Sequence, residues 1–440
     1  MQIDKTTLYD LSVFHSEEEF SLFHKIDLTK TVSGKKVLQK ICAHPLSDVS
    51  SIMEMQETLA MVGSALDRWP TGITNGTIFV IEKFLDDNPE SIPERPDAFR
   101  STLYKFINRT DYAMLFFSMQ QLLAFIRGFH DINILFAGKK MPAPLQRIIQ
   151  ESKHLLNDRR LSGLLDHEQV ERMHTWELLH FARVFHVELP PTLRKLLELH
   201  AQLDAWYALA SANRKLNLHA PIFKEGESPY LEIKSLRHLL LEKPVAYDIV
   251  LDPSKNFIFL TGANMAGKST LIKALGLAVY MAHLGMGVPA AAMHLTTFDG
   301  LLSNINVADN LAKGESYFYN EVRRVKETLE KLEYKKKWLV LIDELFKGTN
   351  IQDAMKCTIA VVEGLSNIKH GLFILSSHLY EIGEELQRLP SLCFKYFETT
   401  LQDNELHFSY QLKEGISKDR MGYLILQKEG VTELLARIGQ

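Results

Sequence analysis

The sequence predicts a chain of class α + α/β, in which an all-helical first half is followed by an α/β domain. Up to about residue 223, leucine-rich stretches alternate with charged residues and β-branched alternation is scarce, which is typical of helices. Pro, Gly and Ser then cluster at 219–233, which indicates a boundary. Beyond it, short β-rich runs are separated by helix-like segments, a pattern typical of a sheet covered by helices.

Length and composition narrow the class of protein. The 440 residues are more than one ordinary core needs, so we expect two or three domains. The net charge of −4 gives no global positive field for nucleic acid. Three widely separated cysteines form no metal or disulfide pattern, and the acidic N-terminus has no signal-peptide run. These features predict a cytoplasmic protein.

The most apolar stretch, 112–126, is shorter than a bilayer span and contains Ser and Gln, so we expect a buried helix and no membrane segment. The helical half also carries a local excess of positive charge, with 16 Lys/Arg against 11 Asp/Glu over 100–215. A solvated helix surface explains this excess, and a weakly basic arm that contacts a phosphate backbone is the alternative.

The α/β half begins with the strand-like runs "VAYDIVL" and "NFIFLTG", and the second leads into "GANMAGKS", residues 262–269. This octapeptide fits the phosphate-binding (Walker A) pattern G-x-x-x-x-G-K-[ST]. Gly262 and Gly267 allow the backbone N–H groups to wrap around phosphate oxygens, and the next helix offers its N-terminus. Lys268 supplies a charge for the β and γ phosphates, and Ser269 supplies a hydroxyl ligand for Mg²⁺. The motif therefore predicts a site for nucleotide phosphates and Mg²⁺, and ATP is the nucleotide that the family resemblance given below implies.

A second acidic motif follows the buried-type strand 338–342, in "WLVLIDELFKGTN". Asp343 and Glu344 stand at the C-terminal end of this strand, where α/β sheets bind ligands. We expect Asp343 to hold Mg²⁺ and Glu344 to polarise the attacking water. His378 follows the next strand, "GLFILSSH", and is a candidate sensor of the γ-phosphate. In "DNLAKGESYFYNEV", 309–322, the residues alone predict only that Ser316 caps a helix.

Four motifs together resemble the ATPase domain of the MutS family of DNA mismatch repair proteins. They are "TGANMAGKST", "DELFKGTN", "SSHLYEI" and "VADNLAKGESYF", in that family's order. "SLRHLLLEKPVAYDIVL" and "GVPA" are similar to further parts of that domain, and 24–62 resembles the start of the family's helical core. The resemblance is strongest over 235–400.

This resemblance implies an ABC-type P-loop ATPase that works as a homodimer on DNA. The implied domains are a helical core and lever at 1–223, an ATPase domain at 224–410 and a dimerisation segment at 411–440, where Gly422 and Gly430 match. Ser316 matches a signature serine that reaches the partner subunit's γ-phosphate, His378 matches the switch histidine, and Asp343 and Glu344 match the catalytic carboxylates. The nucleotide-binding positions implied are Gly262, Asn264, Met265, Ala266, Gly267, Lys268, Ser269, Thr270 and Ser316.

The sequence departs from the family pattern at several positions. Ala266 stands where glycine is usual, and a positive φ there would strain the loop. Phe346-Lys347 replaces Gly-Arg, and Tyr317 replaces threonine after the signature serine. The helical core begins about 25 residues after Met1, so we expect neither a mismatch-recognition nor a connector domain.

Two functions of different classes follow. The first is a nucleotide-switched homodimeric clamp that hydrolyses ATP and binds DNA, structure-specifically or as plain duplex, without mismatch recognition. The second is an ATP-gated scaffold or ribosome-associated switch that does not bind DNA, which the net charge of −4 favours. A small-molecule P-loop kinase is a third, weaker reading, because the resemblance of 309–322 and His378 fits a dimeric site better.

Overall fold

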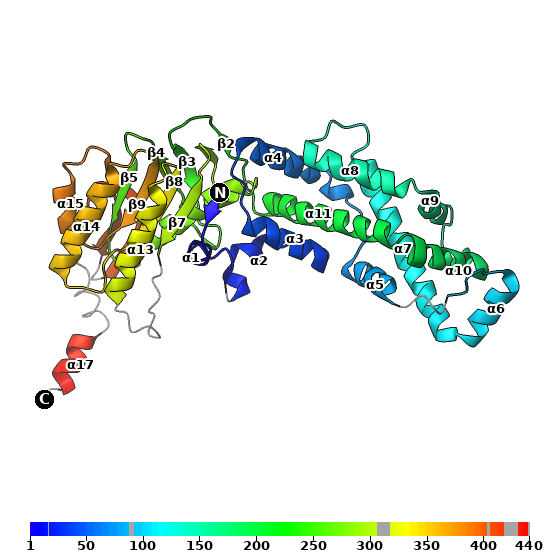
Figure 1. Cartoon of the computed structure of the whole chain (residues 1–440). Helices are drawn as coiled ribbons and strands as arrows, with labels where there is room; N and C mark the ends of the chain where they lie inside the picture. The colour runs from blue at the N-terminus through cyan, green and yellow to red at the C-terminus, as the bar shows by residue number, and fades with distance from the viewer. Residues whose placement is uncertain (16, 88–91, 306–316, 403–404, 418–429, 439–440) are drawn as a thin grey trace. The chain divides into compact units, whose positions relative to one another are not determined.

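The computed structural model describes residues 1–15, 17–87, 92–305, 317–402, 405–417 and 430–438 (Figure 1). Contacts divide the chain into two compact units. The sheet unit contains Met1–Lys25, His44–Ile52 and Leu216–Gln440, and the helical unit contains Ile26–Ala43 and Met53–Lys215.

Two long helices, α7 and α11, run through the helical unit, and each carries more buried residues than any other helix of that unit. Phe125 and Phe129 of α7 meet His200 of α11 edge to face, with ring centroids 5.8 and 6.2 Å from the histidine. The helices are α3 (Val32–Ala43), α4 (Val49–Gly63), α5 (Asn75–Asp86), α6 (Ala98–Ile107), α7 (Arg109–Leu135), α8 (Ala143–Leu156), α9 (Arg159–Leu165), α10 (Thr175–Arg183) and α11 (Pro190–Lys215).

The buried carboxylate of Asp204 in α11 fixes the start of α3. It accepts hydrogen bonds from the backbone N–H groups of Lys30 and Thr31 and from the Thr31 hydroxyl, at 2.6–3.1 Å. A Cβ at Gly34 would lie 2.1 Å from an Asp204 carboxylate oxygen, so α3 approaches α11 this closely only because residue 34 is glycine.

A seven-stranded sheet forms the centre of the sheet unit, in the order β1-β7-β8-β9-β5-β10-β11. The first six strands are parallel, and β11 joins β10 antiparallel. Their carboxyl ends therefore share one edge. The strands are β1 (Gln2–Ile3), β5 (Phe257–Thr261), β7 (Gly300–Asn304), β8 (Trp338–Asp343), β9 (Gly371–Ser376), β10 (Leu392–Gln402) and β11 (Glu405–Glu414).

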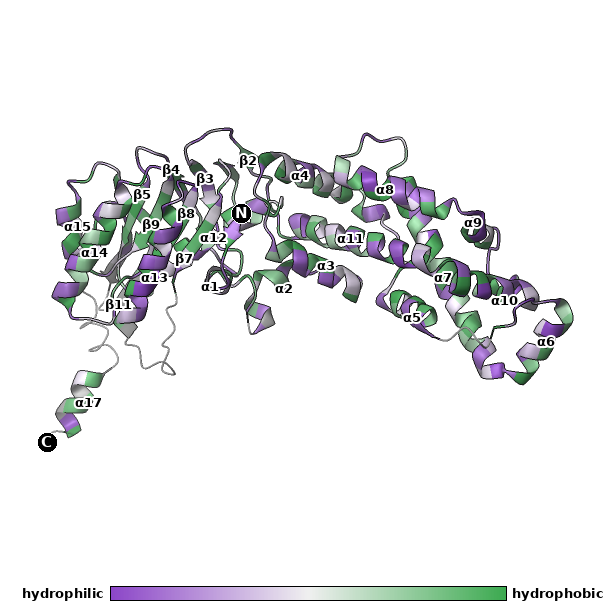
Figure 2. Ribbon diagram, viewed as in Figure 1, coloured by the Kyte–Doolittle hydropathy of each residue, from purple (hydrophilic) through white to green (hydrophobic). Residues whose placement is uncertain are grey.

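Helices cover both faces of this sheet, and the central strands are buried throughout and mostly apolar (Figure 2). One face packs Val340 and Phe373 against α13 (Tyr317–Leu332), α14 (Ile351–Ser366) and α15 (Glu381–Leu386). On the other face, α12 (Lys268–His283) approaches β8 so closely that a Cβ at Gly276 would lie 2.6 Å from Leu341. Buried on both faces, the strands carry the continuous apolar runs seen in the sequence.

The remaining elements complete the sheet unit. A smaller sheet has the order β2-β6-β3-β4. Its strands are β2 (Ile222–Phe223), β3 (Leu231–Leu236), β4 (Tyr247–Leu251) and β6 (Ala292–Leu295), and the other helices are α1 (Lys5–Asp10), α2 (Leu22–Ile26) and α17 (Val431–Ile438).

The predicted combination of helical and α/β structure is confirmed, and strands form within the β-rich runs 245–251, 256–262, 338–342 and 371–378, as expected. The compact units do not coincide with the domain ranges predicted from the sequence. Residues 1–25 belong with the sheet unit because β1 hydrogen-bonds to β7, and β11 crosses the expected boundary at 410/411 because it pairs with β10. Of the helices in the described part of the chain, none combines the length and apolar character needed to cross a bilayer.

Candidate functional site

The loop between β5 and α12 turns on three residues with left-handed backbone. Gly262, Met265 and Gly267 have φ values of 142°, 68° and 110°. The two glycines adopt this conformation at no steric cost, whereas Met265 carries strain. Ala266 keeps a negative φ and is buried, so the strain expected at that position falls on its neighbour instead.

Lys268 is the first residue of α12, and its side chain folds back into the loop. The ammonium donates hydrogen bonds to the carbonyl oxygens of Gly262 at 2.8 Å and Ala263 at 3.1 Å. Burial lowers the pKa of Lys268, and the carboxylates of Glu344 and Asp343 oppose that shift. The side chain is only 5% exposed, so its charge acts on the loop interior.

Asp343 lies at the carboxyl end of β8 and joins the loop to the neighbouring strand. One carboxylate oxygen accepts a hydrogen bond from the hydroxyl of Ser269 in α12, and the other accepts one from the hydroxyl of Ser376 in β9. Strand register explains the contact, because Ser376 pairs with Asp343 on one side and with Leu260 on the other. Ser376 was not singled out from the sequence, where only its place before His378 distinguishes it.

Glu344 follows directly, and two lysines and a histidine surround its carboxylate. Lys347 lies 3.1 Å away, His378 3.8 Å and Lys268 3.9 Å. The contact with His378 is the largest cause that lowers the pKa of Glu344 to about 2, against the opposing effect of burial. The backbone of Glu344 is left-handed, with φ 61°, and its N–H donates to the Ser376 carbonyl. The carboxylate is therefore ionised at neutral pH and held toward Lys268.

Phe346-Lys347, which stands where the family pattern has Gly-Arg, lies in the turn after β8. Phe346 adopts φ 60°, a conformation that glycine would adopt freely, and is held there by burial against Phe318 at a ring distance of 5.8 Å. The buried carboxylate of Glu321 accepts hydrogen bonds from the backbone N–H groups of Lys347 and Gly348. The turn therefore keeps its shape without glycine at 346.

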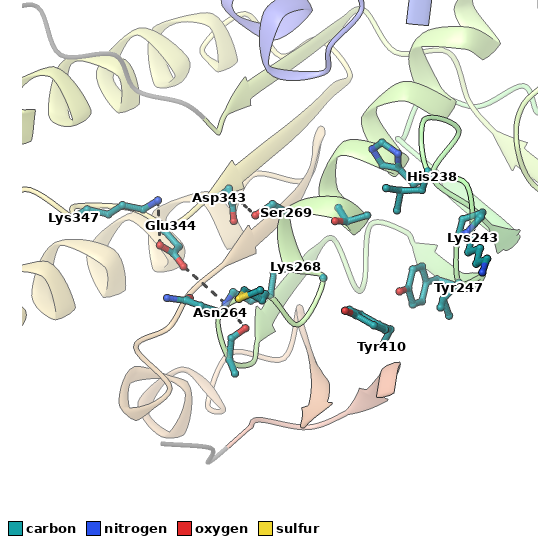
Figure 3. Close-up of a pocket in the computed structure, with 17 residues that line it drawn as sticks. His238, Lys243, Tyr247, Asn264, Lys268, Ser269, Asp343, Glu344, Lys347 and Tyr410 are labelled. Carbon is teal, nitrogen blue, oxygen red and sulfur yellow. Dashed lines mark hydrogen bonds and ion pairs between the residues drawn. The ribbon is translucent and has the colours of Figure 1, made fainter. Parts of the chain in front are cut away.

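The phosphate loop, Asp343, Glu344 and Lys347 line a cavity of about 660 Å³ (Figure 3). Asn264, Lys268, Ser269, Asp343 and Glu344 lie on one side of it, and the tyrosines of β4 and β11 lie on the other. The residues of that second side were not predicted, and they are His238, Leu241, Lys243, Pro244, Val245, Tyr247 and Tyr410.

On the side of the cavity opposite the phosphate loop, Tyr410 approaches the loop, and Tyr247 and His238 have shifted pKa values. Tyr410 has φ 53° and would lie 3.6 Å from a Cβ at Gly267, so β11 approaches the loop directly. Burial raises the pKa of Tyr247 to about 12 and lowers the pKa of His238 to about 4, so both side chains are neutral at pH 7. This wall is uncharged except for Lys243.

The donor set fits Mg²⁺. A serine hydroxyl and a carboxylate meet at the loop, and within the described residues no three His, Cys, Asp or Glu side chains gather as a self-sufficient metal site. Mg²⁺ in nucleotide sites takes one or two protein ligands and completes its shell with phosphates and water. Ser269 and Asp343 are the residues that would hold it.

Some predicted residues cannot be placed. Ser316 and Gly422 lie outside the described residues, and Gly430 is described at the start of α17. The structure therefore brings together Lys268, Ser269, Asp343, Glu344 and His378, and leaves the role of Ser316 a prediction.

Comparison with known proteins agrees with this geometry. The family model of MutS domain V matches residues 258–437. DNA mismatch repair protein MutS of Thermotoga maritima is 26% identical over 98% of this chain and 64% of its own length. The Lactococcus lactis subsp. cremoris protein of that name is 23% identical over 97% of this chain and 53% of its own length. The Thermotoga petrophila protein is 32% identical over 55% of this chain and 30% of its own length. The chain thus spans less than two thirds of each of these relatives. Residues 258–437 thus form a domain of the MutS family, and the similarity to MutS proteins extends over nearly the whole chain.

Proposed function

We propose that this chain binds and hydrolyses ATP with Mg²⁺, as one subunit of a nucleotide-switched homodimer. One observation carries the proposal: a lysine, a hydroxyl and two carboxylates converge on a left-handed loop at the carboxyl edge of a parallel sheet. Such a loop and helix N-terminus bind phosphate groups, and the carboxylates serve hydrolysis of the terminal one.

Each group has a definite task in this proposal. The backbone N–H groups from Asn264 to Thr270 bind phosphate oxygens, and the Lys268 ammonium exchanges its carbonyl partners for the β and γ phosphates. Mg²⁺, held by Ser269 and Asp343, would neutralise developing charge on the phosphates. Glu344 orients the attacking water, since its low pKa keeps it ionised as a hydrogen-bond acceptor.

The aromatic wall opposite the loop supports recognition of the base. Tyr247 and Tyr410 line the same cavity as Lys268. Neutral aromatic rings stack on nucleobases, while a cationic wall would attract only phosphate. We therefore assign the wall to the nucleoside and the loop to the phosphates.

The second half of the active site comes from the other subunit in this proposal, through Ser316. Mixing tests it. Ser316→Ala and Lys268→Ala should each be inactive as homodimers, and mixing them should restore hydrolysis, because a heterodimer contains one complete site. In a 1:1 mixture about a quarter of the parent rate is expected, since half of the dimers are mixed and each has one good site. High activity of Ser316→Ala alone would contradict the assignment.

DNA is the proposed partner, and the mismatch-recognition step is not part of the proposal. The relatives are named DNA mismatch repair proteins, and the helical unit carries the local positive excess noted above. Duplex binding should weaken steeply with salt, because each neutralised phosphate releases counterions. Titrations of labelled duplex and branched DNA at several salt concentrations, with and without ATP, measure the slope. No binding at low salt in either state would exclude DNA and favour the ATP-gated scaffold.

A further inference from the structure

The helix α6 exposes its apolar side to solvent. Its exposed large side chains are spaced i, i+4, i+7 and i+8, so they form one stripe, which we call the α6 stripe. They are Phe99, Leu103, Phe106 and Ile107, with 79%, 48%, 68% and 66% of their surface exposed. The buried residues of the helix are instead Ser101 and Tyr104. A helix normally packs such a stripe on its own core, so this face has no partner within the described part of the chain.

The α6 stripe lies at one end of the helical unit. The carboxylate of Asp97 caps the helix by accepting a hydrogen bond from the Arg100 N–H, and it also pairs with that residue's guanidinium. The other side of α6 packs against α10 and α7 (Figure 1). The Ser101 hydroxyl is buried there, and no described residue forms a hydrogen bond with it. A buried unpaired hydroxyl and exposed phenylalanines both cost free energy, and large exposed apolar patches mark interaction surfaces.

Two cations close to the stripe contact aromatic rings. The Lys105 ammonium lies 4.9 Å from the ring centre of Tyr112, and the Arg109 guanidinium lies 5.0 Å from that of Phe106. Within the described residues, neither cation forms an ion pair with a carboxylate. A cation on an aromatic face keeps its net positive charge, so both remain available to an anion.

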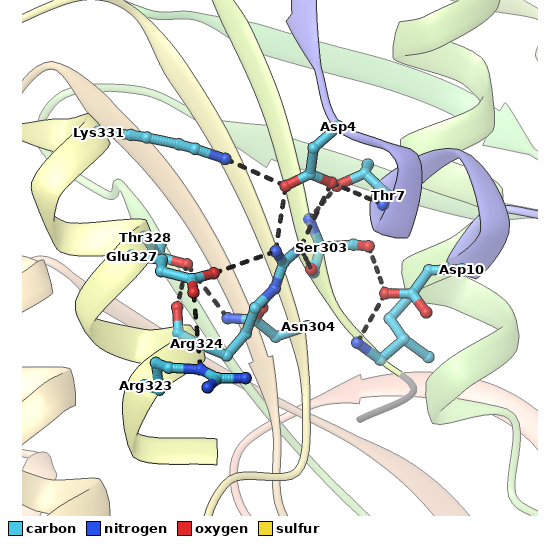
Figure 4. Close-up of polar contacts among 11 residues, drawn as sticks. Asp4, Thr7, Asp10, Ser303, Asn304, Arg323, Arg324, Glu327, Thr328 and Lys331 are labelled. Carbon is cyan, nitrogen blue, oxygen red and sulfur yellow. Dashed lines mark hydrogen bonds and ion pairs between the residues drawn. The ribbon is translucent and has the colours of Figure 1, made fainter. Parts of the chain in front are cut away.

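Cations on α13 show the more usual arrangement. Arg324 and Lys331 each lie 3.1 Å from an oxygen of Asp4, so a carboxylate of the same chain neutralises them (Figure 4). From residue 98 to residue 110, by contrast, the sequence contains three basic residues and no acidic one. The surface around α6 therefore combines apolar side chains with positive charge, and its partner must offer apolar material and negative charge together.

Three kinds of partner differ in what they offer to this surface. A second copy of the stripe would bring Lys105 and Arg109 close to the same two cations, which repel them. Duplex DNA offers phosphates but little apolar surface for Leu103 and Ile107. An anionic bilayer offers both, because acyl chains lie directly beneath charged headgroups. Helices with Phe and Leu on one side and basic residues nearby lie in that boundary.

We propose that the α6 stripe docks the helical unit on the surface of an anionic lipid bilayer. The stripe enters the boundary between headgroups and acyl chains, while Lys105 and Arg109 bind the anionic headgroups. The helix lies along the surface and does not cross the bilayer. The residues assigned to nucleotide take no part in this contact, so the inference is independent of the proposed function.

Phe99→Ser is the decisive variant. Phe99 is the most exposed side chain of the stripe, so its replacement should leave the unfolding temperature and ATP hydrolysis unchanged. We expect the full chain to sediment with vesicles of phosphatidylcholine and phosphatidylserine mixed at about 2:1. The vesicle affinity of the variant should fall about tenfold, because a large apolar side chain no longer leaves water on binding.

Phe20→Ser is the matched control. Phe20 is 60% exposed, follows three glutamates in the chain and belongs to the sheet unit. The same side chain is thus removed from an acidic surface, and vesicle binding should equal that of the parent. An equal loss in both variants would show an unspecific effect of surface hydrophobicity and would overturn the proposal.

Lys105→Gln and Arg109→Gln, introduced together, test the contribution of charge. Affinity for the phosphatidylserine vesicles should fall about tenfold or more, since each basic residue near an anionic surface adds attraction. The weaker binding to vesicles of phosphatidylcholine alone should not change. If the double variant binds phosphatidylserine vesicles as tightly as the parent, the proposal is wrong.

Absence of parent binding to the phosphatidylserine vesicles would also overturn the proposal, and two further measurements then identify the partner. A loss of dimers in light scattering of Phe99→Ser would assign the stripe to a contact between copies of the chain. Weaker binding of labelled DNA by the Lys105 and Arg109 double variant would assign the surface to nucleic acid.

Discussion

At the scale of single residues, glycine substitutions at Met265 and Ala266 test the backbone conformation of the phosphate loop. Met265 has a left-handed backbone and is 79% exposed, whereas Ala266 has a negative φ and is 1% exposed. We expect Met265→Gly to stabilise the protein by about 0.5–1 kcal/mol, because it relieves strain without loss of packing. Ala266→Gly should destabilise it by about 1 kcal/mol. Denaturant unfolding measures both, and the reverse order would show that the loop has a different backbone.

Glu344 predicts a dependence of stability on pH. Its pKa in the folded chain is about 2, below the ordinary value of 4.5, chiefly because His378 lies beside it. The ionised carboxylate therefore stabilises the fold above about pH 4.5, and this contribution is lost as the pH falls toward 2. The parent should be more stable than Glu344→Gln at pH 7, and the difference should narrow at pH 3. An unchanged difference between these pH values would contradict the low pKa.

The sequence indicated the charged residues of the site better than their partners. Lys268, Ser269, Asp343 and Glu344 stand in motifs whose spacing implies their chemistry, and the structure brings them together. Ser376 and Tyr410 reach the site only through the register of β9 and the hairpin of β10 and β11. Pairing between distant segments leaves no local pattern, so these two could not be predicted.

At the scale of elements, a pair of glycines tests the packing of the phosphate-loop helix. A Cβ at Gly276 would lie 2.6 Å from both Leu11 and Leu341, whereas at Gly364 in α14 nothing lies within 4 Å. Gly276→Ala should cost about 1–3 kcal/mol through overpacking. Gly364→Ala should gain up to about 1 kcal/mol, since alanine is the better helix former. Thermal unfolding distinguishes them, and equal shifts would contradict the close contact.

Element prediction succeeded where a strand or helix carries its own pattern. The buried strands β5, β8 and β9 read as apolar runs because both faces of the sheet are covered. β1 could not be predicted, because two residues show no periodicity and its pairing partner β7 lies about 300 residues away in the chain. For the same reason, residues 1–25 were expected in the helical half and belong to the sheet unit.

At the scale of the whole molecule, the proposed switch requires nucleotide to favour one arrangement of two subunits over another. In the proposed homodimer, a γ-phosphate shared between the phosphate loop of one subunit and Ser316 of the other would supply that difference in affinity.

Glu344→Gln tests the central claim most directly. Without the carboxylate, water is not oriented for attack, while the groups that bind the phosphates are unchanged. We expect the variant to bind ATP as tightly as the parent, to hydrolyse it at least about a hundredfold more slowly, and to accumulate as an ATP-bound dimer in light scattering. Hydrolysis at the parent rate would contradict the assignment of this site.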